Sequence, residues 1–238
     1  MNQLFNVYST VRKHTTMYFV KSPLLLCKLY QRNEIWNIDT REKDIYLTFD
    51  DGPVPETTPW ILNVLEKYKA QATFFCVGEN VVRNPNLFDS ILSRGHSVGN
   101  HTFNHMNGWK SPVKDYVDNV MKCNEIIPTT LFRAPYGRIK RAQINELRPY
   151  FTMIFYSVLT GDFDCEITPA KCLNNAVINT RAGSIVVFHD SLKAWPNLKY
   201  ALPAFLEHFS MQGYQFKALP YGIKTQKSAS NLLTLEYN

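Results

Sequence analysis

The chain has 238 residues, 45% of them hydrophobic, and its 26 basic and 20 acidic side chains leave a formal net charge of +6. These values are typical of one large soluble domain. The charge is uneven, because residues 1–33 contain five basic residues and no acidic one, while the other 205 residues carry 21 basic and 20 acidic side chains. A basic N-terminal arm on a nearly neutral body argues against a nucleic-acid partner, whose binding patch would cross the folded domain.

No stretch of the sequence reaches the ~18–20 apolar residues that a membrane-spanning helix needs. The apolar run SPLLLC at residues 22–27 is shorter than the core of a secretory signal. We therefore expect a cytoplasmic or membrane-peripheral protein, whose arm is either solvated or in weak contact with an anionic membrane surface. Five cysteines without a C-x-x-C pair indicate reduced thiols rather than a disulfide framework.

Strands and helices are expected to alternate along the chain. The segment DIYLTFD at residues 44–50 is rich in β-branched and aromatic side chains and predicts a strand. Residues 57–69 follow with apolar side chains at helical spacing and Pro59 in the first turn, which predicts a helix. Further strands are expected at residues 72–77, 96–99, 131–133, 151–158, 184–189 and 214–217, and further helices at 84–95, 112–126, 139–148, 169–180 and 197–211.

Seven strands that alternate with helices predict an α/β fold with a parallel sheet. The length favours a relative of the eightfold (β/α) barrel that lacks one unit, and a doubly wound open sheet is the alternative. We expect a basic arm at residues 1–33, a catalytic domain at 34–222 and a C-terminal tail at 223–238.

Polar residues cluster where the expected strands end. They are Asp50 and Asp51 after the first strand, His101 and His105 after the third, Arg133 after the fourth, Asp162 and Asp164 after the fifth, and His189 and Asp190 after the sixth. The active site of a parallel β/α barrel lies at the carboxyl ends of its strands. We therefore expect these side chains to converge on one rim.

The segment GNHTFNH at residues 99–105 indicates a metal site. Two histidines four positions apart lie on one face of a helical turn, and Gly99 would give them a flexible lead-in. Zinc is the usual ion for two imidazoles and one carboxylate. Asp50 or Asp51 is expected to supply that carboxylate, because the chain turns at the strand end and both side chains reach the site.

The remaining polar residues favour metal-assisted hydrolysis of a carbonyl compound. One aspartate would bind the metal while its neighbour takes a proton from the attacking water. Arg133 would hold this base by opposite charge. His189 is the candidate acid for the leaving group, with an aspartate such as Asp162 behind it to keep it protonated. Trp109 and Trp195 are candidates for stacking on a sugar.

Five segments resemble the ordered motifs of a known family. TFDDG (48–52), HTFNH (101–105), RAPYG (133–137), GDF (161–163) and VFHD (187–190) closely resemble the motifs of the polysaccharide deacetylases, carbohydrate esterase family 4 with its NodB-like domain. The resemblance implies a distorted seven-stranded parallel (β/α) barrel. It also implies an enzyme that removes N-acetyl groups from N-acetylglucosamine-containing glycans, such as peptidoglycan, chitooligosaccharides or lipid-linked sugars.

The resemblance implies a metal cofactor. Asp51, His101 and His105 would bind one divalent ion, with zinc as the first choice and cobalt, nickel or manganese as alternatives. The partner implied is an N-acetylated glycan substrate, and neither a nucleic acid nor a defined oligomer is implied.

The resemblance also implies catalytic roles. Asp50 would be the general base, oriented by Arg133, and His189 the general acid, tuned by Asp162. The backbone N–H of Tyr136 would join the metal in stabilising the oxyanion.

The chain departs from the family pattern at Leu159, Phe163 and Val187, which replace an aspartate, a tryptophan and a leucine of the motifs. These departures are expected to change the choice of substrate and to leave the acid–base pair intact. Two other classes stay open: a non-catalytic carbohydrate-binding relative, and a zinc hydrolase of a non-sugar amide. A binding module has no need of both a base and an acid, which argues against the first.

Overall fold

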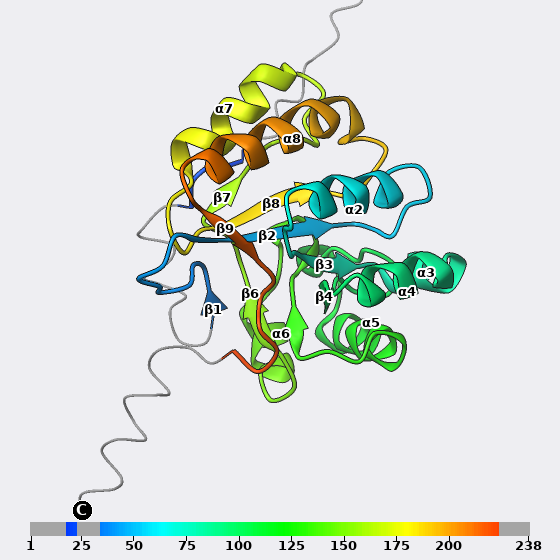
Figure 1. Ribbon diagram of the computed structural model, residues 1–238. Helices are drawn as coiled ribbons and strands as arrows, with labels where there is room; N and C mark the ends of the chain where they lie inside the picture. Colours follow the sequence, from blue (N-terminus) through cyan, green and yellow to red (C-terminus); the bar gives the residue numbers. More distant parts are fainter. Residues whose placement is uncertain (1–17, 23–33, 224–238) are drawn as a thin grey trace, which may run out of the picture.

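The computed structural model describes residues 18–22 and 34–223. Within these ranges nine strands form one sheet, with helices around it (Figure 1). The strands are β1 Glu34–Ile35, β2 Asp44–Asp50, β3 Thr73–Cys76, β4 Ser97–Asn100, β5 Leu131–Phe132, β6 Thr152–Ile154, β7 Val158–Leu159, β8 Ile185–His189 and β9 Gln215–Lys217. The helices are α2 Thr58–Lys67, α3 Gly78–Arg83, α4 Pro85–Ser93, α5 Val113–Ile126, α6 Arg141–Leu147, α7 Pro169–Asn179 and α8 Trp195–Met211, with 3₁₀ turns η1 Gly108–Lys110 and η2 Pro135–Gly137.

The sheet is parallel and curls into a barrel. Its order is β1-β6-β5-β4-β3-β2-β8-β7, with β9 also paired to β2, and every strand pair is parallel. Six strand steps separate β6 from β7, which would be about 29 Å in a flat sheet. The chain from Ile154 to Val158 can span only about 14 Å. The sheet must therefore bend until residues 155–157 connect its two sides.

The core lies between the strands and the helices that cover their outer face. The central strand β2 is buried along six of its seven residues, as expected for a parallel strand with both faces covered. Phe49 packs against Phe188 of β8, which packs against Phe205 of α8, with ring centroids 6.1 and 5.8 Å apart. Helices α7 and α8 lie at one side of the sheet in Figure 1, and α6 lies at the other.

The predicted fold class is confirmed, with differences in detail. Each expected strand is present, but the segment 151–158 is divided into β6 and β7, because the chain crosses between the two sides of the barrel at residues 155–157. The sequence prediction missed β1 and α3, which are too short to show periodicity. The doubly wound alternative is wrong, because the sheet curls until the short connection at residues 155–157 joins β6 and β7 across the barrel.

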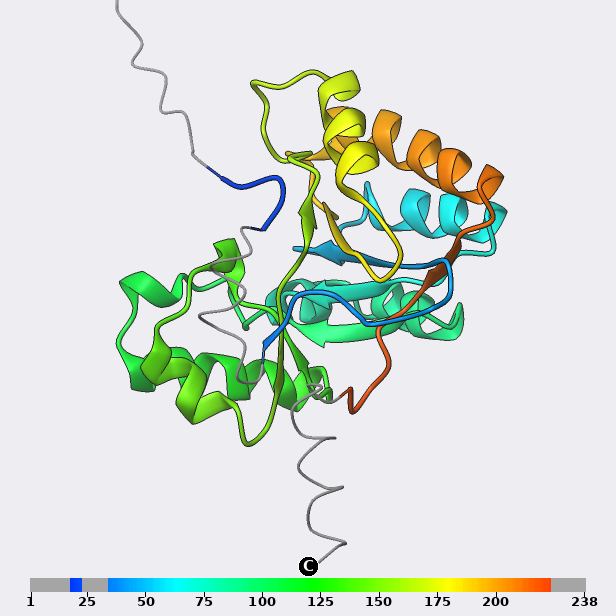
Figure 2. The same cartoon turned by 90° about the vertical axis from the view of Figure 1, so that its left-hand side faces the viewer.

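Residues 18–22 add an antiparallel segment beside β7, which Figure 2 shows in dark blue. Lys21 pairs with Val158, and the amide of Leu159 donates to the carbonyl of Val20 at 2.8 Å. The amide of Ser22 donates to the carbonyl of Ser157 at 3.2 Å. This segment covers part of the edge that β7 would otherwise leave open. The rest of the expected arm and nearly all of the C-terminal tail lie outside the described residues, so the domain limits stay predictions.

None of the helices in the described ranges is long and apolar enough to cross a membrane. Cys76, Cys123, Cys165 and Cys172 are free thiols, as expected, and Cys27 lies outside the described residues.

Deleting residues 1–16 should leave the unfolding free energy unchanged, because the segment 18–22 is retained. Deleting residues 1–22 should lower it by about 1–3 kcal/mol, since the hydrogen bonds to the β7 edge are lost and each contributes about 0.5–1.5 kcal/mol. Urea unfolding of the two truncations measures the difference. Equal stability of both would show that the 18–22 segment contributes nothing to the fold.

Candidate metal centre and active site

The polar residues at the strand ends meet at one rim, as the sequence predicts. Asp50 is the last residue of β2, and His189 is the last residue of the neighbouring strand β8. The two are register partners, so they stand side by side. His101 directly follows β4 and Arg133 directly follows β5. The carboxyl ends of four strands thereby supply the site.

Asp51, His101 and His105 form a cluster that fits a metal ion. One ligand atom from each lies within 4.8 Å of the others. Asp51 Oδ1 is 3.7 Å from His101 Nε2 and 3.0 Å from His105 Nε2. Two imidazoles and one carboxylate are a typical ligand set for a catalytic metal with an open coordination position. Asp51, rather than Asp50, is the aspartate that approaches both rings.

The other ring nitrogens of the two histidines are already engaged. His101 Nδ1 donates to the carbonyl of Arg133 at 2.8 Å. His105 Nδ1 is hydrogen-bonded to the hydroxyl of Tyr136 at 3.1 Å. Both contacts leave Nε2 directed at Asp51, and such outer contacts set the tautomer and ring orientation of metal-binding histidines.

The protonation states suit a metal site. Burial alone would raise the pKa of Asp51, but its hydrogen bond with His105 and the charge of His189 together hold that pKa below its usual range. Burial lowers the pKa of His101 to about 4. A charged carboxylate and a neutral imidazole at neutral pH are the forms that bind metal.

The histidine pair is not on a helical turn, and that expectation is wrong. Residues 101–107 form a loop, in which Thr102 and His105 have left-handed backbone angles, with φ of 66° and 57°. The loop is held by the amide of Thr102, which donates to Asn100 Oδ1 at 2.9 Å, and by that of Met106, which donates to Thr102 Oγ1 at 2.9 Å. Spacing alone did not distinguish a helical turn from this loop.

Gly99 also acts differently from the expectation. It lies inside β4, and a Cβ atom there would come within 2.4 Å of the Phe75 ring. Phe75 in turn lies 4.1 Å below the guanidinium of Arg133. The glycine therefore provides space for a ring under Arg133 rather than a flexible lead-in.

Left-handed backbone conformations concentrate at the site. Among the described non-glycine residues, positive φ occurs at Asp51 (85°), Thr102 (66°), His105 (57°), Tyr136 (61°) and, away from the site, Lys69 (50°). Such residues cost free energy and cluster at functional sites. At Asp51 the turn directs the carboxylate away from the direction of Asp50, so two adjacent aspartates can face different partners.

Arg133 binds Asp50 inside the barrel. Its Nη1 is 2.7 Å from Asp50 Oδ1 and 2.7 Å from Thr48 Oγ1, and only 4% of Arg133 and 5% of Asp50 are exposed. Nε and Nη2 donate to the carbonyls of Ile154 and Phe155 at 3.3 and 3.1 Å. Burial lowers the pKa of Arg133, and the charge of Asp50 opposes that effect. The pair orients Asp50 toward the rim.

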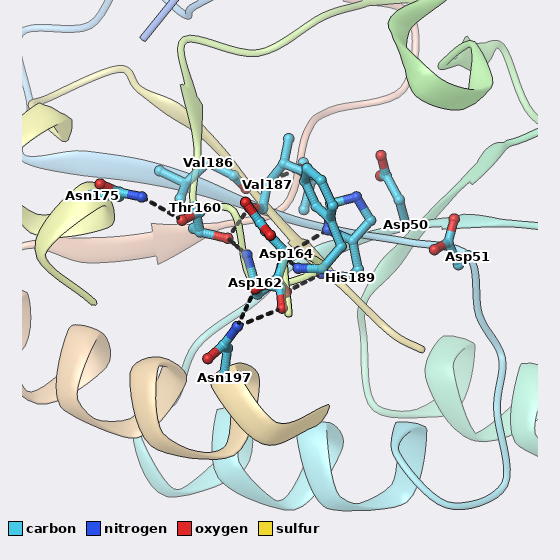
Figure 3. Close-up of polar contacts among 12 residues, drawn as sticks. Asp50, Asp51, Thr160, Asp162, Asp164, Asn175, Val186, Val187, His189 and Asn197 are labelled. Atoms are coloured by element: carbon cyan, nitrogen blue, oxygen red, sulfur yellow. Dashed lines mark hydrogen bonds and ion pairs between the residues drawn. The ribbon is translucent and has the colours of Figure 1, made fainter. Parts of the chain in front are cut away.

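His189 is paired with Asp162, which is fully buried. Asp162 Oδ1 is 2.7 Å from His189 Nδ1, and Asp162 Oδ2 accepts the His189 amide at 2.7 Å. Burial alone would lower the pKa of His189, but the charge and hydrogen bond of Asp162 outweigh it and raise that pKa to about 9. In Figure 3, Asp162 and Asn197 lie on one side of His189, and Asp50 and Asp51 lie on the other.

Sequence reasoning missed the residues that support the Asp162 loop. Asn197 Nδ2 donates to the carbonyls of Asp162 and Asp164, both at 3.0 Å. Tyr18 donates its hydroxyl proton to Asp164 Oδ2 at 2.9 Å and packs on Phe163. These contacts join distant parts of the chain, so no local pattern marks them.

Asp190 supports the loop after β2. It is fully buried, and the hydroxyls of Thr57 and Thr58 donate to its carboxylate. Burial raises the pKa of Asp190 to about 7. A Cβ atom at Gly52 would meet Asp190 Oδ2 at 2.3 Å, so only glycine fits there. The aspartate therefore holds the segment that carries Asp51, and it appeared in the sequence only as the neighbour of His189.

The two tryptophans have different surroundings. Trp195 is half-buried and packs edge-on against Trp60, with ring centroids 4.9 Å apart, at the side of the main hydrophobic core. Trp109 is 60% exposed and lies 5.4 Å from the guanidinium of Arg138.

A parallel (β/α) barrel with an Asp–His–His cluster and acid–base groups at its carboxyl rim is typical of metal-dependent hydrolases. The polysaccharide deacetylase family profile matches residues 37–150. A peptidoglycan-N-acetylglucosamine deacetylase of Bacillus cereus is 33% identical over 188 residues, which are 76% of this chain and 88% of the relative. This protein therefore belongs to the polysaccharide deacetylase family, carbohydrate esterase family 4.

Two further comparisons agree with this assignment. A chitooligosaccharide deacetylase of Azorhizobium caulinodans is 33% identical over 165 residues, 64% of this chain and 76% of the relative. The crystal structure of the Bc1960 peptidoglycan N-acetylglucosamine deacetylase superposes with a TM-score of 0.76 at 29% identity, and the match covers 84% of this chain and 95% of that one.

His101→Ala and His105→Ala should each weaken Zn²⁺ binding by more than about 100-fold. Loss of a residue that only hydrogen-bonds to a metal ligand already costs about 10–100-fold, and loss of the ligand itself should cost more. Tyr136→Phe, which removes only the hydroxyl at His105, should weaken binding by about 10-fold. Isothermal titration of the metal-stripped proteins measures these affinities, with His208→Ala on α8 as the control. Wild-type affinity in both histidine variants would place the metal elsewhere.

Proposed function

We propose that this protein is a metal-dependent hydrolase that removes N-acetyl groups from N-acetylglucosamine-containing glycans. The observation that carries the proposal is the placement of Asp50 and His189 as register partners beside the Asp51, His101 and His105 cluster. A base and an acid next to a metal cluster suit hydrolysis of an amide. The names of the relatives, peptidoglycan and chitooligosaccharide deacetylases, support a glycan substrate.

Asp51, His101 and His105 would hold the ion, with zinc as the first choice and cobalt, nickel or manganese as alternatives. When bound, the ion supplies Lewis acidity, which polarises the acetyl oxygen and makes water a better nucleophile. Asp50 accepts the proton of the attacking water. Arg133 holds the carboxylate of Asp50 in place for this transfer, at 2.7 Å.

His189 completes the reaction by giving a proton to the sugar nitrogen as the carbon–nitrogen bond breaks. Acetate and the free sugar amine are the products. The contact with Asp162 uses Nδ1 of His189 and leaves Nε2 for the substrate. Because its pKa is raised to about 9, His189 is protonated at neutral pH and ready to act as an acid.

The backbone N–H of Tyr136 is proposed to stabilise the oxyanion that forms during attack. Two observations support this role: Tyr136 has a left-handed backbone conformation, with φ of 61°, and its ring centroid is 4.6 Å from that of His105.

The departures from the family pattern bear on substrate choice. Leu159 and Val187 are buried in adjacent strands, whereas Phe163 lies 4.9 Å from His189. Phe163 is therefore the departure that contacts the proposed acid directly. Because phenylalanine is smaller than tryptophan, Phe163 would form a smaller aromatic wall next to the sugar nitrogen of the substrate.

Asp50→Asn should cut acetate release from an N-acetyl chitooligosaccharide by roughly 10²–10⁴-fold, the usual range for a lost general base, and should retain the metal. His189→Ala should also retain the metal and fail on the amide. It should lose less activity on an aryl acetate ester, whose leaving group needs less protonation. Acetate release from both substrates measures the amide-to-ester ratio. Equal loss on both in the His189 variant would exclude it as the acid.

Asp162→Asn should move the alkaline limb of kcat to lower pH by about one unit or more, because burial then lowers the pKa of His189 without opposition from that charge. The acid works only while protonated, so activity is present below the pKa of His189 and is lost as the pH rises through it. A pH–rate profile measures the limb. Asp164→Asn, which touches Tyr18 instead, is the control, and an unmoved limb in the Asp162 variant would contradict the assignment.

A further inference from the structure

A ledge formed by the exposed rings of Trp109 and Tyr136 and the half-buried side chain of Arg138 runs outward from the metal cluster. Tyr136 contacts His105 with ring centroids 4.6 Å apart. The guanidinium of Arg138 lies 6.0 Å from the Tyr136 ring and 5.4 Å from the Trp109 ring. The ledge is thus continuous with a proposed metal ligand.

The ledge is exposed but held in a defined place. Trp109 and Tyr136 are 60% and 62% exposed. Trp109 Nε1 donates to the carbonyl of Ile139 at 3.3 Å, and its amide donates to Asn107 Oδ1 at 3.1 Å. An indole that is fixed by hydrogen bonds and open to solvent does not serve core packing. It is available for a partner.

A buried glutamine joins the two segments that carry the ledge. Gln143 Nε2 donates to the carbonyl of Gly108 at 2.9 Å, and Gln143 Oε1 accepts the amide of Lys140 at 2.8 Å. A Cβ atom at Gly108 would lie 2.5 Å from the carbonyl oxygen of Arg138, so only glycine allows the two segments to approach this closely. The relative position of Trp109 and Arg138 is therefore set before any ligand binds.

The charge of the ledge is positive. Residues 107–111 and 135–143 contain four basic side chains and no acidic one. The basic residues are Lys110, Arg138, Lys140 and Arg141. The body of the protein is nearly neutral, so this concentration is local. A guanidinium is suited to binding a carboxylate in a bidentate manner and can stack on an aromatic ring at the same time.

We propose that the ledge is a subsite for sugars next to the reacting one, and that Arg138 selects glycans whose neighbouring sugars carry carboxylates. Trp109 and Tyr136 provide aromatic faces on which the apolar sides of the sugar rings stack. Arg138, which lies near both rings, binds the carboxylate of the neighbouring sugar. This inference rests on the proposed glycan deacetylase function, because the reacting sugar must lie at the metal cluster for its neighbours to reach the ledge.

The test compares two forms of one ligand. The probe is a tetrasaccharide of alternating N-acetylglucosamine and N-acetylmuramic acid, either with free lactyl carboxylates or with the same carboxylates as methyl esters. Binding is measured by titration calorimetry on the zinc-loaded Asp50→Asn protein, which should not turn over the ligand. We expect the acid to bind about three- to tenfold more tightly than the ester, and the preference to shrink at high salt because salt screens the attraction between the carboxylate and Arg138.

Variants in the same background assign the preference. Arg138→Gln should abolish it and leave ester binding unchanged, and Arg138→Lys should restore part of it. Trp109→Ala should weaken both forms about equally. Tyr200→Ala on α8 and Arg148→Gln at the end of α6 are controls for an exposed aromatic and an exposed arginine, and neither should change affinity. Thermal melts establish that each variant is folded.

The outcomes separate this inference from the proposed function. Equal affinity for acid and ester, or a preference that survives Arg138→Gln, overturns the subsite. Acetate release by the wild-type enzyme is measured separately. If no glycan releases acetate while the Arg138-dependent preference is present, the deacetylase function fails and the carboxylate-binding ledge stands.

Discussion

The buried ion pair between Arg133 and Asp50 is the interaction on which the rest of the site depends. Arg133 follows β5, yet its guanidinium reaches Thr48 and Asp50 of β2, three strands away in the sheet order. It therefore crosses the interior of the barrel. Removing one partner of a buried pair leaves an uncompensated charge and typically costs about 3–5 kcal/mol of stability. The pair therefore also stabilises the contact between β5 and β2 at the rim of the barrel.

The ion pair helps to give two adjacent aspartates different roles. Asp50 is held at 2.7 Å by Arg133, while the left-handed turn at Asp51 directs the next carboxylate to the two histidines. Asp190 supports the segment that carries Asp51 through its contact with Gly52. Tyr136 supports His105 through the hydrogen bond to its ring. The strained backbone angles at the rim are compatible with a stable fold because such contacts fix them from several directions.

The strands, the helices and the rim could be predicted from the sequence because each buried run ends in polar residues. The backbone conformation that orients those residues could not be predicted from the sequence. Spacing places His101 and His105 near each other but does not give the sign of φ at His105. Tyr18 bonds to a residue 146 positions away, and Gly99 is explained only by the Phe75 ring that fills its space. Long-range packing decides such features, and a single sequence does not display it.

The most direct test of the division between Asp50 and Asp51 is a crystal structure of the zinc-loaded protein with an anomalous map at the zinc edge. One ion is expected, bound at about 2.0–2.2 Å by Asp51, His101 Nε2 and His105 Nε2. Asp50 should remain on Arg133 and should not be a ligand. An ion bound by Asp50, or bound away from the two histidines, would contradict this division of roles.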